Sequence, residues 1–73
     1  MPLIQVKVIE GVFTKEQKQD MVRKLTDTMV AIEGENLRGA TVVLIEDVLS
    51  GEWGIGGNPL TTADAKALAA GKN

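Results

Sequence analysis

The sequence predicts an α+β fold built from a single βαβ unit with parallel strands, followed by a β-hairpin turn and a short C-terminal helix. Three observations lead to this prediction. An alternating strand pattern opens the chain at Leu3–Ile9, a capped amphipathic helical pattern follows it, and a second apolar strand pattern covers Thr41–Ile45. A connection that contains a helix returns the second strand parallel to the first, with a right-handed crossover.

The first strand is predicted at Leu3–Ile9 because apolar and polar residues alternate along it. Ile4, Val6 and Val8 fall on one face, and Lys7 falls on the opposite face. The Glu-Gly pair at residues 10 and 11 then ends the strand.

The helix is predicted to begin after Thr14, whose hydroxyl is a favourable N-cap. Gln17 stands three residues later and completes a capping-box pattern. Gly34 ends the helix, as glycine often does just beyond a last turn. An apolar stripe at spacings of three and four is expected to pack on the sheet: the Lys18 stem, Met21, Val22, Leu25, Met29 and Ile32.

The second strand is almost continuously apolar, which predicts burial on both of its faces. Further along, four glycines surround the only tryptophan, Trp53, and predict a tight turn or short hairpin over residues 50–57. A short alanine-rich helix follows over residues 63–70, with Thr61 or Thr62 as its cap and Gly71 after its end.

The chain has 73 residues, which indicates one domain with a small core. Below about 80 residues a lone core rarely supplies more than roughly 3–5 kcal/mol of stability. The chain contains no cysteine and no histidine, so neither disulfides nor the usual zinc ligands are available. Two strands under one helix also leave open edges and an uncovered face. We therefore expect a homo-oligomer.

The charge distribution narrows the class of partner. The net charge is -2, and the basic residues are interleaved with acidic ones, so nucleic acid is not an expected partner. The sequence shows neither a secretory signal pattern nor a transmembrane span, and a cytoplasmic location is expected.

Without histidine or cysteine, no Ser-His-Asp or Cys-His arrangement can form. Chemistry must come from carboxylates, lysine, arginine, hydroxyls or the chain terminus. No metal and no organic cofactor are predicted. Met21 and Met29 lie on the apolar helix face, which favours core packing over metal ligation.

Several short motifs together resemble the 4-oxalocrotonate tautomerase family, over residues 1–57. They are Met1-Pro2 directly before a strand, Ile9-Glu10-Gly11, Glu16-Gln17-Lys18, Ile45-Glu46, and the most specific one, Trp53-Gly54-Ile55-Gly56-Gly57. The resemblance implies a cofactor-independent isomerase that assembles as a hexamer built from three dimers and acts in the catabolism of aromatic compounds. Residues 58–73 form a C-terminal extension without a matching family segment, within one tautomerase-like domain spanning 1–73.

The resemblance implies that Pro2 becomes a catalytic secondary amine once Met1 is removed. Burial lowers the pKa of an amine, so a neutral Pro2 nitrogen would serve as general acid and base for a small enol or keto acid. The resemblance also places Trp53, Ile55 and Val12 as an apolar wall beside that amine. Met-Pro by itself favours the simpler interpretation, an ordinary start of an edge strand, where proline needs no donor.

Two positions depart from the family pattern. Val12 stands where family enzymes usually carry an arginine after Glu-Gly, and Thr41 stands where a second arginine is usual, or Val42 if an extra residue precedes the strand. Arg38 is the best remaining candidate to bind a substrate carboxylate; otherwise it is a solvated loop arginine. Thr41, Trp53 and Ile55 complete the candidate substrate-binding set. Trp53 is as readily explained as an interface anchor.

Two further hypotheses stay open. Hydration or dehalogenation of an unsaturated acid would need a protonated proline and a carboxylate, Glu52 or Glu46, to activate water. Alternatively, the missing arginines indicate a non-catalytic subunit of a hetero-oligomeric tautomerase. A variant that lost hydratase activity while keeping tautomerase activity would support the first of these hypotheses.

Overall fold

The computed structural model describes residues 1–72 and contains two compact units. Met1–Val6 and Thr14–Glu46 form the first unit, and Lys7–Phe13 forms the second together with the chain from Asp47 onward. The elements follow in the order β1 (Leu3–Ile9), α1 (Lys15–Glu33), the 3-10 helix η1 (Glu35–Ala40), β2 (Val42–Val48), β3 (Trp53–Ile55), β4 (Asn58–Leu60) and α2 (Thr62–Ala69).

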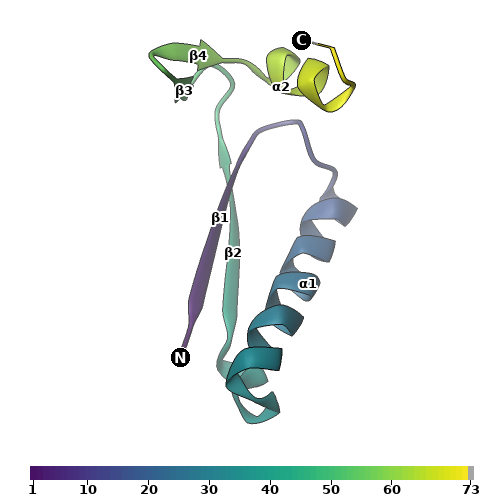
Figure 1. Cartoon of the computed structure of the whole chain (residues 1–73), viewed down its shortest axis with the longest axis vertical. Coiled ribbons are helices and arrows are strands. Elements are labelled where there is room, and N and C mark those ends of the chain that lie inside the picture. Colours follow the sequence, from purple (N-terminus) through teal and green to yellow (C-terminus); the bar gives the residue numbers. More distant parts are fainter. Residues whose placement is uncertain (73) are drawn as a thin grey trace. The chain divides into compact units, whose positions relative to one another are not determined.

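Strands β1 and β2 pair in a two-stranded parallel sheet, which confirms the predicted βαβ unit (Figure 1). The Val42 amide donates to the Pro2 carbonyl oxygen at 3.2 Å, and the Glu10 amide donates to the Val48 carbonyl oxygen at 2.8 Å. These bonds join equivalent ends of the two strands. The second strand runs three residues further than its predicted end at Ile45, since Glu46, Asp47 and Val48 keep extended backbone.

Both predicted ends of α1 are confirmed. The Thr14 hydroxyl accepts from the Gln17 amide at 3.1 Å, and the Gln17 side chain accepts from the Thr14 amide at 2.8 Å. Gly34 follows the helix with φ of 104°, a backbone conformation that side chains other than hydrogen disfavour. Local sequence therefore set the length of this helix.

The apolar face of α1 differs from the predicted stripe at Ile32 and at Val22, which is 37% exposed. Val30 is the most buried residue of the helix, at 5% exposed, and Met21, Leu25 and Met29 are half-buried. Ile32 is 78% exposed, so its predicted place on the covered face is wrong. The reason is geometric, because two residues beyond Val30 the helix has turned roughly half a circle to the opposite side.

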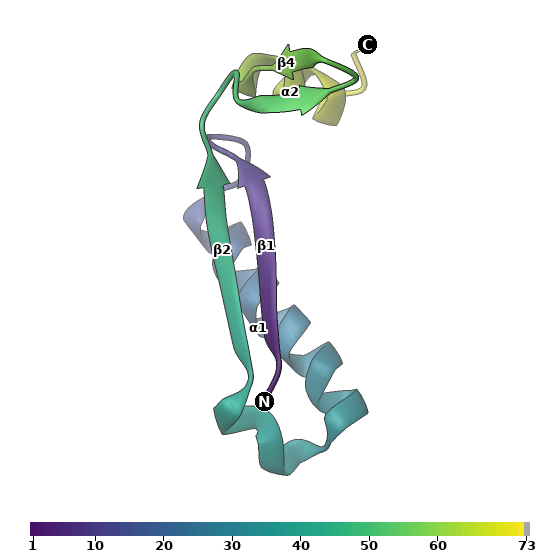
Figure 2. The same cartoon turned by 90° about the vertical axis from the view of Figure 1, so that its left-hand side faces the viewer.

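Within the first unit, α1 runs alongside one face of the sheet and leaves the other open (Figures 1 and 2). Leu3, Val42 and Leu44 on the open face are 56%, 44% and 43% exposed. The prediction that the second strand is buried on both faces is therefore wrong for a single chain. The single helix α1 covers only one face of the sheet, although the apolar composition of β2 suits burial on both faces.

The second unit contains the predicted hairpin. β3 and β4 pair antiparallel, with Trp53 opposite Leu60 and Ile55 opposite Asn58. Gly56 and Gly57 form the turn with φ of 58° and 85°, the combination that a tight two-residue hairpin turn requires. The predicted hairpin is confirmed, although its second strand lies beyond the predicted residues 50–57.

The short C-terminal helix is also confirmed, as α2. The hydroxyl of Thr61 accepts from the Asp64 amide at 3.1 Å, so Thr61 is the N-cap. Gly71 follows the end of the helix with φ of 79°.

The core is small, as the chain length predicts. Among residues 1–72, only Val8, Ile9 and Val30 are buried apolar side chains. In the same part of the chain, no helix combines the length and apolarity needed to cross a membrane.

Candidate functional site

Pro2 lies directly before β1 and is held there by its backbone. Its carbonyl oxygen accepts the hydrogen bond from the Val42 amide at 3.2 Å, which ties the start of β1 to the start of β2. Met1 is 94% exposed and lies outside the strand. Loss of Met1 would therefore free the Pro2 nitrogen without removing a residue of the sheet.

Thr41 immediately precedes β2 and so lies beside Pro2. Its hydroxyl oxygen is 2.8 Å from the Leu37 carbonyl oxygen, and it also makes a close contact with the Glu33 carboxylate. The Thr41 amide donates to the Arg38 carbonyl oxygen at 3.2 Å. A hydroxyl and a carboxylate thus lie together directly before β2.

Arg38 lies in η1, an element that the sequence analysis did not predict. Its guanidinium donates from Nε to Glu35 at 2.7 Å and from Nη1 to Asp27 of α1 at 2.8 Å. Hydrogen bonds to Glu35 and Asp27 raise the pKa of Arg38, and the Arg38 bond in turn lowers the pKa of Glu35 below its usual 4.5. The arginine proposed to bind the substrate therefore already forms ion pairs with two carboxylates.

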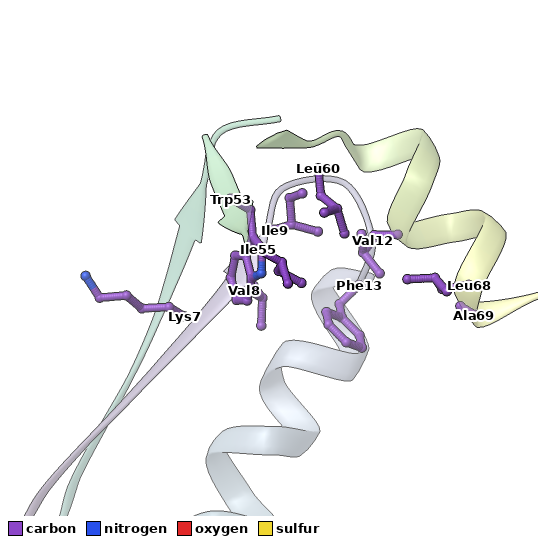
Figure 3. Close-up of a pocket in the computed structure, with 11 residues that line it drawn as sticks. Lys7, Val8, Ile9, Val12, Phe13, Trp53, Ile55, Leu60, Leu68 and Ala69 are labelled. Carbon is purple, nitrogen blue, oxygen red and sulfur yellow. The ribbon is translucent and has the colours of Figure 1, made fainter. Parts of the chain in front are cut away.

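An apolar pocket of about 490 Å³ lies within the second unit (Figure 3). It gathers the three residues proposed as an apolar wall, Val12, Trp53 and Ile55, from separate parts of the chain. Lys7 belongs to the lining, but its side chain extends away from the other labelled residues (Figure 3). The complete lining comprises Lys7, Val8, Ile9, Val12, Phe13, Trp53, Ile55, Leu60, Ala65, Leu68 and Ala69.

Sequence reasoning missed the contribution of the C-terminal helix to this pocket. Ala65, Leu68 and Ala69 of α2 all line it. Their spacing of three and four residues places them on one helix face. This spacing is the feature of the sequence from which the wall could have been predicted. Alanines bury little area each, so the face was not recognised as a wall.

The candidate residues divide between the two units. Pro2, Arg38 and Thr41 belong to the first, whereas Trp53 and Ile55 belong to the second. Pro2, Arg38 and Thr41 are absent from the pocket lining. The first group supplies an amine precursor, a hydroxyl and a cation. The second supplies apolar side chains, and an amine placed among them would hold its proton less tightly.

Comparison with known proteins gives consistent matches over most of the chain. A family model described as "Tautomerase enzyme" matches residues 2–63. A probable tautomerase of Ralstonia nicotianae is 41% identical over 63 residues, covering 86% of this chain and 87% of the relative. A probable tautomerase of Dickeya dadantii is 34% identical over 61 residues, covering 84% and 90%. Among solved structures, a 4-oxalocrotonate tautomerase isozyme from Methylibium petroleiphilum superposes with a TM-score of 0.67 at 34% identity, covering 88% and 97%.

Proposed function

Because this chain belongs to the tautomerase family, we propose that it interconverts the enol and keto forms of a small unsaturated keto acid, with Pro2 as general acid and base. One observation carries this proposal. The family match begins at residue 2, and Pro2 follows an exposed Met1 at the start of β1. A proline amine in this place needs no histidine, which the chain lacks.

The proposed chemistry needs a neutral amine. The Pro2 nitrogen accepts the proton of the enol hydroxyl, and the resulting ammonium returns a proton to carbon of the same conjugated system, so no net proton is gained or lost. A chain-terminal amine has a usual pKa of about 7.7–8.0, and a proline amine is more basic. Desolvation beside apolar side chains is what would lower the pKa of the Pro2 amine to a useful value.

We assign the apolar wall to Val12, Trp53 and Ile55 of the pocket. Since Pro2 does not line the pocket of its own chain, the proposal is that amine and wall meet in a homo-oligomer. The small buried core and the open apolar sheet face support an oligomer. The hexamer that the resemblance implies remains a prediction.

Negative charge develops on the substrate oxygen during the reaction, and a donor beside it lowers the barrier. Arg38 and Thr41 are the proposed donors for substrate oxygens. Arg38 must exchange an existing partner for a substrate carboxylate, so Glu35 and Asp27 compete with the substrate.

Removing one competitor should therefore tighten substrate binding. With Glu35→Gln, we expect the KM for a monocarboxylate substrate to fall about two- to fivefold with kcat unchanged, since an exposed ion pair screened by solvent competes only weakly. Steady-state kinetics measures this change. Glu16→Gln, which removes the same charge from the exposed first turn of α1, is the matched control. Equal KM values for the two variants would exclude Arg38 as the carboxylate ligand.

The same ion pair predicts that the competition between Glu35 and the substrate carboxylate for Arg38 depends on pH. The pKa of Glu35 is lowered by its bond to Arg38, so the pairing is complete above the usual pKa of 4.5 and is lost as the pH falls through the lowered value. Assays near neutral pH thus sample the fully paired state.

Intact-mass measurement on protein made in the native host tests the proposal before any substrate is tried. We expect the mature chain to lack one methionine residue, because Met1 is exposed and proline follows it. The comparison is a variant with additional N-terminal residues, in which the Pro2 nitrogen remains part of an amide. This variant should not ketonise phenylenolpyruvate or 2-hydroxymuconate. A native chain that retains Met1 and is still active would exclude Pro2 as the base.

No specific observation favours hydration or dehalogenation. Glu46 and Glu52 are exposed, and neither lines the apolar pocket. The alternative of a non-catalytic subunit is tested by assaying the purified chain alone. Such a subunit would need a second chain for turnover and would show no activity by itself. The cytoplasmic location and a role in the catabolism of aromatic compounds stay predictions.

A further inference from the structure

We propose that α2 is a specificity-determining wall of the apolar pocket, that Leu68 sets the size of the apolar group admitted, and that Thr62 positions the helix. The inference rests on the proposed function, because it takes the substrate's apolar part to enter this pocket. The family match ends at residue 63, whereas Ala65, Leu68 and Ala69 of the lining follow it. The part of the wall that α2 supplies therefore lies beyond the residues that the family model matches.

The start of α2 is fixed by a network of hydrogen bonds within the second unit. The Thr62 hydroxyl donates to the Glu10 carbonyl oxygen at 2.6 Å, and the Thr62 amide donates to the Ser50 hydroxyl at 2.9 Å. The Ser50 amide in turn donates to the Glu10 carboxylate at 3.1 Å. Three chain segments thus meet at Thr62.

Gly11 shows how close this approach is. It has φ of 78°, and a Cβ atom built on it would lie 3.1 Å from the Thr62 methyl carbon. The absence of a side chain at Gly11 lets Thr62 pack directly against the end of β1. Since eight helical residues are marginal in water by themselves, this attachment decides where α2 lies.

Leu68 is the largest side chain that α2 presents to the pocket, because the other two lining residues are alanines. It is 55% exposed, so it has room to be shortened or enlarged without disturbing a packed core. Val8 and Ile9, on the β1 side of the pocket, are buried and less adaptable. Within α2, size selection therefore falls to Leu68.

The occupant that the pocket fits is the apolar substituent of a small molecule. Its volume of about 490 Å³ lies within the range of about 300–1,000 Å³ that ligand pockets occupy. Ten of its eleven lining side chains are apolar, and the eleventh, Lys7, extends away. A compact ring or branched alkyl group suits this lining better than a second carboxylate.

The fluorescence of Trp53, the only tryptophan, reports ligand entry without requiring turnover. Titration of the full chain with phenylpropionate and with the bulkier adamantaneacetate gives two dissociation constants. Leu68→Ala should shift their ratio about tenfold toward adamantaneacetate, and Leu68→Phe should shift it toward phenylpropionate. Leu49→Ala is the matched control, because Leu49 is 56% exposed and lies outside the lining.

The positioning role of Thr62 is tested in the same titration. Thr62→Val should weaken both ligands about three- to tenfold by releasing α2. Thr28→Val removes an equivalent hydroxyl-to-carbonyl bond, made to Lys24 within α1, and should change neither constant. Rescue by Thr62→Ser would confirm that the hydroxyl is responsible.

Unchanged ratios in both Leu68 variants would overturn the inference. So would Trp53 fluorescence that ignores both ligands and follows protein concentration instead, since a second copy of the chain would then fill the pocket. Failure of the proposed function is separately visible. In that case ketonisation is absent, while the binding ratios of the Leu68 variants still shift.

Discussion

Replacing Pro2 with alanine is expected to lower kcat/KM for ketonisation of phenylenolpyruvate by about a hundredfold or more. A positioned general acid and base contributes roughly 10²–10⁴-fold, and the alanine variant replaces the secondary amine by a less basic primary one. The backbone bond from Val42 to residue 2 does not involve the proline ring, so the start of β1 should persist. Steady-state kinetics on protein with verified mass measures the effect.

Pro59→Ala is the matched control for this variant. Pro59 is exposed in β4 and lies outside the pocket lining, so its replacement should leave turnover within about twofold of the original. A Pro2→Ala variant with undiminished kcat/KM would refute the proposed role of the amine. Circular dichroism and thermal melting separate a chemical loss from an unfolded protein.

Leu44→Glu is expected to dissociate the assembly. Leu44 lies two residues beyond Val42 along β2, on the open face of the sheet, and is 43% exposed in the single chain. Burying a leucine side chain contributes about 1.5–3 kcal/mol, and in a symmetric contact the change occurs twice. Association should weaken by about a hundred- to ten-thousandfold. Sedimentation measured over a range of protein concentrations determines this loss.

Dissociation should also destabilise the fold, because the described single chain buries only Val8, Ile9 and Val30. The melting temperature is expected to fall and to depend on protein concentration. Ile32→Glu is the control, since Ile32 is 78% exposed on the outer side of α1. If Leu44→Glu sediments like the original protein, the open sheet face is not the subunit contact.

Local chemistry made much of the fold predictable. Thr14 and Gln17 satisfy the free amides at the start of α1, and Gly34 ends it, within a few residues of each other in sequence. The glycines at 56 and 57 likewise provide the positive φ angles that the hairpin turn needs. Such features depend on neighbours along the chain, so they can be recognised without knowledge of packing.

Features that depend on distant residues were harder to predict. The Ile32 error arose because spacing fixes a helix stripe only approximately, and the register against the sheet decides which edge is covered. The pairing of Arg38 with Asp27 joins residues eleven apart through an unpredicted 3-10 helix. The role of Thr62 depends on contacts with Glu10 and Ser50, which no local pattern reveals.

The sequence by itself determined the order of elements, the position of Pro2 before the first strand, and the chemical types available, because these follow from short-range propensities and from which side chains are present. Tertiary structure alone decided that Arg38 is held by two carboxylates and that α2 closes one side of an apolar pocket with Trp53. Both depend on which segments pack together, and that is a property of the whole chain's hydrogen bonds and buried surface.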